Sequence, residues 1–85
     1  MSLTAAEWYT IEDDSVLGID QIIANNYPYL DILDWDQTDK NNFVQRNIDS
    51  INVMLLEQVV IDDSTSKTKY TDAIAAGTTY INNNS

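Results

Sequence analysis

The clearest pattern in this chain is a helical spacing of apolar residues in its second half. From Asp39 to about Ile61, apolar side chains recur at the intervals of one helix face, and polar residues fall on the other faces. The apolar positions are Phe43, Val44, Ile48, Ile51, Leu55 and Val59. The stretch from Asp36 to Asp39 supplies a start signal ahead of this run. The spacing therefore predicts one long central helix over 39–61.

Two helices are expected before it. Thr4 and Glu7 fit a capping box, in which each side chain bonds to the backbone of the other residue, so a short first helix should run through Tyr9. An acidic stretch and Ser15, a good capping residue, then precede apolar residues at helical spacing. The pattern predicts a second helix from about Ser15 to Asn26.

Pro28 marks a break and a restart. Tyr27 is pushed out of the helical region by the proline that follows it, while Pro28 itself suits the first turn of a helix. Tyr29, Leu30, Leu33 and Trp35 form a short third segment that should cover the core.

The end of the chain is ambiguous. Residues 62–69 have the composition of a linker, and residues 82–85 form a polar tail that should fray. Between them, residues 70–81 match a helical stripe, although Gly77–Ile81 also fits a glycine turn followed by a strand; we favour the helix. The expected fold is an all-α bundle of three to five helices with one long central helix and a polar C-terminal tail. The expected organisation is a helical core domain over 1–62, then a linker and a weakly helical segment over 63–85.

Composition narrows the classes of function. The 85 residues suffice for one domain, and 14 acidic against 4 basic residues give a net charge of −10. Such a surface disfavours direct contact with nucleic acid or anionic lipid and favours a basic partner. The chain shows neither a secretory signal nor an apolar run of the ~20 residues that a membrane span needs. We therefore expect a soluble, cytoplasmic protein.

The most site-like cluster is acidic. Asp31, Asp34, Asp36 and Asp39 offer the oxygen ligands that calcium prefers. In the helix-loop-helix calcium pattern, however, Asp39 falls where glycine must turn the chain, and Gln45 falls where a bidentate glutamate is needed. We predict no metal and no cofactor, and interpret these acids as solvated caps of the long helix.

Catalysis is not expected either. Adjacent acids such as Asp13 and Asp14 do not face each other on a regular element. The chain has no histidine or cysteine to act as base or nucleophile, and its two glycines cannot form a phosphate-binding loop. The chain should have no catalytic residues and should not be an enzyme.

An interface is predicted instead. Residues 53–61 are apolar nearly all round the expected helix, so they cannot all face the interior of one small domain. With a nearby aromatic residue, they should meet another subunit. The predicted interface residues are Trp35, Val53, Leu56, Val60 and Ile61.

The N-terminal pattern resembles a known family. The run Thr4–Asp14, followed by Val16, Leu17, Ile22, Ile23 and Tyr29, is similar to the start of the head–tail connector (adaptor) proteins of tailed phages. Those proteins also open with a capped short helix, an acidic turn and a second amphipathic helix. The resemblance implies a viral structural protein that forms a ring of identical subunits at the neck of the virion, found in virions or in the host cytoplasm.

These observations predict a non-enzymatic assembly protein, in the favoured version a connector-type structural component that forms homo-oligomers or contacts neighbouring subunits. The alternative is an acidic inhibitory module that mimics nucleic acid and binds a basic partner. A mimic should present ordered carboxylates on one face, whereas an assembly subunit should present apolar patches.

Overall fold

The computed structural model describes residues 2–85, and every regular element in that range is a helix. The predicted all-α bundle is therefore confirmed. The helices are α1 (Ala5–Ile23), α2 (Leu30–Leu33), α3 (Gln37–Leu55), α4 (Gln58–Ile61) and α5 (Thr68–Asn83).

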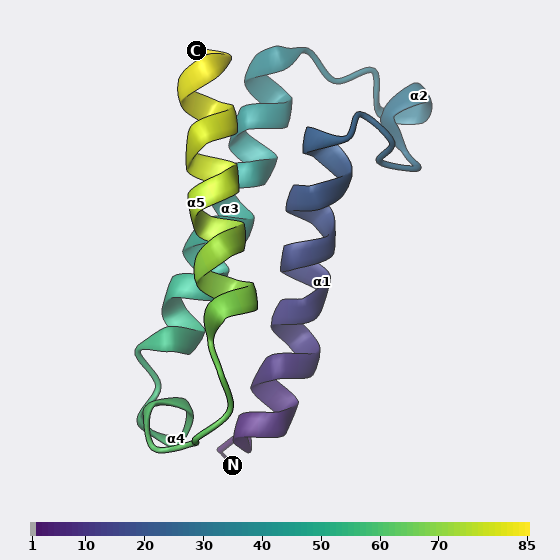
Figure 1. Cartoon of the computed structure of the whole chain (residues 1–85). Coiled ribbons are helices and arrows are strands. Elements are labelled where there is room, and N and C mark those ends of the chain that lie inside the picture. The colour runs from purple at the N-terminus through teal and green to yellow at the C-terminus, as the bar shows by residue number, and fades with distance from the viewer. Residues whose placement is uncertain (1) are drawn as a thin grey trace.

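Three long helices form the body of the molecule, which measures 39 × 24 × 17 Å. Helix α1 runs from one end of the bundle to the other, α3 returns antiparallel to it, and α5 runs parallel to α1 (Figure 1). Each of these helices packs against the other two. Helix α2 lies at the end where α1 finishes, and α4 lies at the opposite end, near the N-terminus (Figure 1). Ile19, Val44, Ile51 and Met54 are fully buried between the three helices.

The first helix is continuous, so the prediction of two separate helices was wrong. Helix α1 passes without a break through the acidic stretch that suggested a turn. No glycine or proline lies between Tyr9 and Ser15, and the Asp13 and Asp14 side chains remain exposed without interrupting the helix. Ser15 is a buried residue within the helix, and does not cap one.

The predicted helix over 39–61 is interrupted. Helix α3 ends at Leu55, and Glu57 adopts an extended backbone (φ −71°, ψ 129°) before α4 begins. The break changes the helical phase, which allows Met54 and Val60 both to be fully buried on the two sides of it. The apolar periodicity showed no such interruption because no helix-breaking residue marks it.

The C-terminal segment packs into the same core as the rest of the chain. The boundary expected at residue 62 therefore does not separate two independently packed parts. Helix α5 confirms the helix favoured for 70–81, and it extends into the expected tail as far as Asn83. Tyr70 and Ala73 join the core cluster of α1 and α3. A Cβ atom on Gly77 would lie 3.0 Å from side-chain atoms of both Val44 and Ile48, so glycine permits the close approach of α5 to α3.

Candidate protein-binding surface

The N-terminus of α1 is fixed by the capping box that the sequence predicts. The Thr4 hydroxyl accepts a 3.1 Å hydrogen bond from the Glu7 amide, and the Thr4 amide donates a 2.9 Å bond to Glu7 Oε1. The bond from the Thr4 amide, assisted by the Thr4 side chain, favours the ionised carboxylate of Glu7 and lowers its pKa. Leu3 and Trp8 flank the box at the positions of a hydrophobic staple, and both line one hollow.

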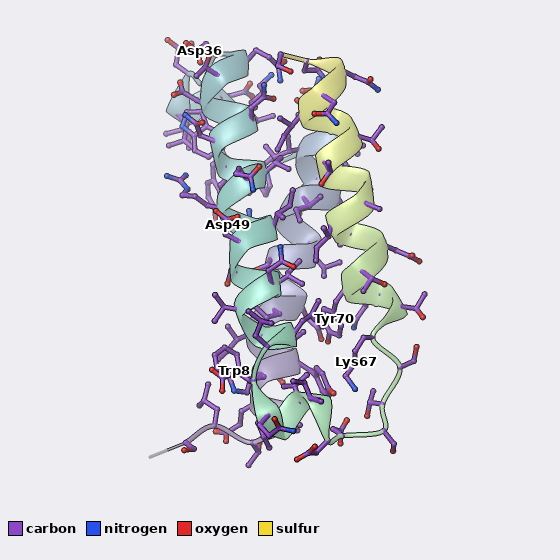
Figure 2. All side chains as sticks on the ribbon, turned by 90° about the vertical axis from the view of Figure 1, so that its left-hand side faces the viewer. Trp8, Asp36, Asp49, Lys67 and Tyr70 are labelled. Atoms are coloured by element: carbon purple, nitrogen blue, oxygen red, sulfur yellow. The ribbon has the colours of Figure 1, made fainter. Side chains whose placement is uncertain are left out.

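That hollow lies between the start of α1 and α4. It has a volume of about 470 Å³, and its apolar walls are Leu3, Trp8 and Val59. A second, more open hollow of about 360 Å³ shares Leu3 with the first and lies along α1 alone, over Ala6, Glu7, Thr10 and Ile11. We call the two together the α1–α4 groove. Figure 2 shows Trp8 toward the end of the bundle opposite Asp36.

Among the residues that the structure describes, those lining the groove include two acids and no basic residue. Its titratable lining groups are Glu7, beside the second hollow, and Glu57, beside the first. Two of the chain's four basic residues are engaged elsewhere: Lys69 pairs with Asp13 at 2.8 Å, and the Lys67 ammonium donates to the carbonyls of Asp63 and Thr65. The first hollow thus has mixed polar and apolar walls, the second is mainly apolar, and each has one glutamate in its lining.

A separate group of apolar side chains is exposed where α3 gives way to α4. Leu56 is 79% exposed, Ile61 54% and Val53 53%. Val53 and Leu56 are three positions apart at the end of α3, so they neighbour each other on one side of it. We call Val53, Leu56 and Ile61 the junction residues.

The predicted interface residues thus have three different surroundings. The junction residues are exposed, as an interface requires. Val60 is fully buried, so it is a core residue and its assignment to an interface is corrected. Trp35 packs against Tyr27 and Phe43 with ring centroids 5.8 and 5.1 Å apart, at the far end of α3 from the junction. It therefore cannot share one local patch with Leu56.

Hydrogen bonds and ring stacking of tyrosine and lysine side chains connect the elements at the α4 end of the bundle. The Tyr9 hydroxyl donates a 2.8 Å bond to the Asp63 carboxylate, and the Tyr70 hydroxyl donates a 2.8 Å bond to Asp13. The rings of Tyr9 and Tyr70 stack with centroids 5.6 Å apart. Figure 2 shows Tyr70 and Lys67 at this end of the molecule. The network joins α1 to α5 and to the segment before it, so it holds the groove wall in place.

The same contacts shift the ionisation of their members. Burial, reinforced by the bond to Asp13, raises the pKa of Tyr70 far above its usual 10.0. Burial and Asp63 raise the pKa of Tyr9 in the same way. The bond from Lys69 is the main reason why the pKa of Asp13 is lowered, and the bond from Thr65 is the main reason for Asp63. The tyrosines therefore remain protonated donors and the aspartates remain charged acceptors at neutral pH.

One carboxylate is buried in the core. Glu12 is 1% exposed; its Oε2 atom accepts a 2.9 Å hydrogen bond from the Ser50 hydroxyl on α3, and its Oε1 atom has no hydrogen-bond partner. No hollow opens onto it among those described. The pair joins α1 to α3 in the middle of the bundle but offers no access to a substrate.

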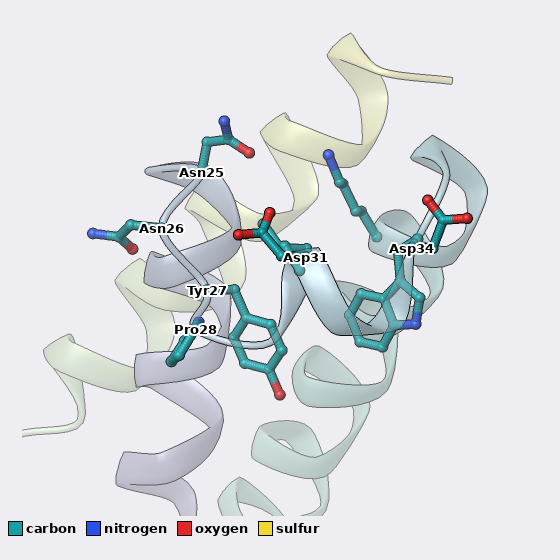
Figure 3. Close-up of a pocket in the computed structure, with 9 residues that line it drawn as sticks. Asn25, Asn26, Tyr27, Pro28, Asp31 and Asp34 are labelled. Atoms are coloured by element: carbon teal, nitrogen blue, oxygen red, sulfur yellow. The ribbon is translucent and has the colours of Figure 1, made fainter.

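The acidic cluster lies at the other end of the molecule. Asp36 and Asp39 form a capping box at the start of α3, with bonds of 2.8 and 3.2 Å, which confirms them as caps. A mainly polar hollow of about 490 Å³ lies nearby and is lined by Asn25, Asn26, Tyr27, Pro28, Leu30, Asp31, Asp34, Trp35 and Lys40 (Figure 3). Across residues 2–85, no three His, Cys, Asp or Glu side chains converge as metal ligands would.

Sequence reasoning missed Leu3 and the groove that it shares. The signal was present, since apolar residues stand on both sides of the Thr4–Glu7 capping box, one before the cap and one in the first turn of the helix. That arrangement predicts a contact between Leu3 and Trp8. It does not predict that Val59, from a distant part of the sequence, completes the hollow.

Comparison with known proteins finds no matching family model, no matching curated protein and no matching solved structure. Within the described part of the chain, none of the helices has the length and apolar character that crossing a bilayer demands. The function must therefore be argued from the surface itself.

Proposed function

We propose that this chain is a non-enzymatic assembly protein that associates with copies of itself or with neighbouring subunits through the junction residues. The observation that carries the proposal is the exposure of Leu56, at 79%, beside Val53 on a highly charged chain. Leucine and valine side chains grouped on a protein surface favour association, because contact removes them from water.

The distribution of charge supports assembly over nucleic-acid mimicry. Exposed acids occur on α1 (Asp14 and Asp20), on α3 (Asp49) and on α5 (Asp72), as well as in the Asp31–Asp39 cluster at one end, so they are spread over several elements and are not gathered on one helix face. A mimic needs carboxylates at phosphate-like spacing along a single surface. The residue pattern over Thr4–Tyr29 resembles that of tailed-phage connector proteins, and on that likeness we propose a ring at the neck of a virion as the specific assembly, although α1 is one continuous helix where the family pattern has two.

Sedimentation velocity tests the proposal. The parent chain should associate as its concentration rises, and more strongly in higher salt, because salt screens the repulsion between chains of charge −10. Leu56→Asp should weaken association by placing an unpaired charge in an apolar contact, at a cost of roughly 2 kcal/mol.

Asn52→Asp is the matched control. Asn52 is exposed one turn before Leu56, so the change adds the same charge without removing an apolar contact. Association of this variant should nearly equal that of the parent. A parent chain that stays monomeric at every concentration and salt, with or without the substitution, would refute self-association through the junction.

A further inference from the structure

We infer that the α1–α4 groove binds a segment of another protein in which apolar anchor residues are flanked by lysine or arginine. This is a second surface and a different partner from the self-association proposed above. The groove and the junction residues share no side chain: Leu3, Ala6, Trp8, Ile11 and Val59 line the groove, and Val53, Leu56 and Ile61 form the junction.

The shape of the groove favours a helical or extended segment with more than one anchor. Its two hollows, of about 470 and 360 Å³, meet at Leu3, and either exceeds the volume of a leucine or phenylalanine side chain. The second hollow follows α1 from Ala6 to Ile11, about one and a half helical turns. Apolar residues one turn apart on an amphipathic helix can thus occupy adjacent hollows.

The groove is held open before any partner arrives. The capping box fixes the backbone of Thr4 and with it the position of Leu3. On the other side, Val60 is anchored in the core next to Val59, and Tyr9 is bonded to Asp63 after the end of α4. A preformed groove requires little ordering when a partner binds, which favours affinity.

The charge of the groove selects the partner. Among residues 2–85, the titratable side chains that line it are Glu7 and Glu57, and the chain as a whole carries −10. An acidic segment would bring like charges together, whereas lysine or arginine beside the anchors would face these carboxylates.

A second copy of the chain does not meet this requirement. Lys67 and Lys69 are engaged by Asp63 and Asp13, and the aromatic residue that follows Lys69, Tyr70, is buried. Arg46 is exposed on α3, but the nearest large apolar residues in sequence, Val44 and Ile48, belong to the core. Lys40, the remaining basic residue, lines the polar hollow together with Asp31 and Asp34, so acids of its own chain already lie beside it. The occupant is therefore a different protein.

The experiment titrates the full chain with two synthetic amphipathic peptides. Both carry leucines at positions i, i+4 and i+7; one has lysines at the remaining flanking positions and the other has glutamates. The readout is the indole N–H signal of each tryptophan in a nitrogen–proton correlation spectrum, assigned with Trp35→Phe. Trp8 lines the groove, whereas Trp35 lies at the other end of the bundle and serves as an internal reference.

Titration with the lysine peptide should move the Trp8 indole signal to a plateau at peptide concentrations below about 1 mM, while the Trp35 signal does not move. The affinity of this peptide should fall as the salt concentration is raised. With the glutamate peptide, the Trp8 signal should not reach a plateau over the same range of concentrations. Val59→Asp should weaken the lysine peptide about tenfold or more, although it adds a negative charge, because the apolar wall is lost. Leu17→Asp is the matched control: Leu17 is 53% exposed, and lies outside the groove, so binding should be unchanged or slightly tighter.

A second variant tests the part of the groove that α4 does not line. Ala6 is exposed in the first turn of α1, so Ala6→Lys should leave the fold intact and weaken the lysine peptide by placing a cation in the second hollow. Lack of saturable binding by the lysine peptide, equal binding of the glutamate peptide, or unchanged binding to both groove variants would overturn the inference. These outcomes are independent of sedimentation, so the groove can fail while self-association stands, and the reverse.

Discussion

The hydroxyl of Tyr70 on α5 donates a 2.8 Å hydrogen bond to the carboxylate of Asp13 on α1, which also pairs with Lys69 of α5 at 2.8 Å. Tyr70 is 3% exposed, so Tyr70→Phe removes a buried donor and leaves the ring packing in place. Because Asp13 is partly exposed and can bind water instead, we expect a loss of roughly 1–2 kcal/mol in the free energy of unfolding. Urea denaturation measures it, with Tyr29→Phe, on an exposed ring, as the control.

The same residue should govern stability at alkaline pH. The pKa of Tyr70 is raised in the folded chain, so the unfolded chain loses this proton first, at about pH 10. The stability that the protonated hydroxyl contributes is fully present below that pH and is lost as pH rises above it. Tyr70→Phe should therefore show a shallower loss of stability between about pH 9 and 11 than the parent. Parallel profiles would show that other groups cause the alkaline loss.

Local signals in the sequence predicted the local structure well. The Thr4–Glu7 and Asp36–Asp39 start signals both became capping boxes, and the stripe through Tyr70, Ala73 and Gly77 became a helix. The predictions that failed concerned features that depend on contacts between residues far apart in the sequence. The acidic stretch before Ser15 suggested a turn, but Glu12 is held inside the bundle by Ser50, which lies 38 residues away in sequence.

The candidate site was predictable only in part, for the same reason. The excess of apolar residues over 53–61 correctly indicated that some must be exposed, as Leu56 and Ile61 are. It did not indicate which ones, because the break at Glu57 resets the helical phase and turns Val60 into the core. The groove joins Leu3 to Val59 through the tertiary fold, and no periodicity within either segment contains that contact.

We expect substitutions at the two members of the buried Glu12–Ser50 pair to change the free energy of unfolding in opposite directions. Glu12→Met replaces a buried carboxylate that has one unpartnered oxygen with an apolar side chain of similar length, and should stabilise the fold by about 1 kcal/mol. Ser50→Ala removes the one bond that the carboxylate accepts, and should destabilise the fold by about 1–2 kcal/mol. Asp14→Asn, at an exposed position, controls for the change in net charge. If Glu12→Met is instead the more damaging change, the carboxylate stabilises the bundle on balance.

The two glycines should respond differently to alanine. At Gly77 the new Cβ would meet Val44 and Ile48 at 3.0 Å in the centre of the core, so overpacking should exceed the gain in helix propensity of about 1 kcal/mol. At Gly18 the nearest atoms, at 3.1 to 3.2 Å, belong to Phe43 and Asn47, which are only partly buried and can move. Thermal melts should show Gly77→Ala below the parent and Gly18→Ala equal to it or above. Equal melting temperatures for the two variants would mean that side chains around Gly77 move aside as easily as those around Gly18.

The adjacent valines of α4 provide the closest matched pair in the chain. Val60 is fully buried and Val59 is 41% exposed, although the two differ by one position and share one short helix. Val60→Ala deletes two buried methyl groups and leaves a cavity, so the free energy of unfolding should fall by about 2 kcal/mol. Val59→Ala should cost less than about 0.5 kcal/mol, because the site is partly open to water and no sealed cavity forms. Urea denaturation of both variants decides the assignment. A helix that continued unbroken from α3 would place the two valines differently, so equal losses, or a larger loss at Val59, would contradict the break at Glu57 and the wall that Val59 gives to the α1–α4 groove.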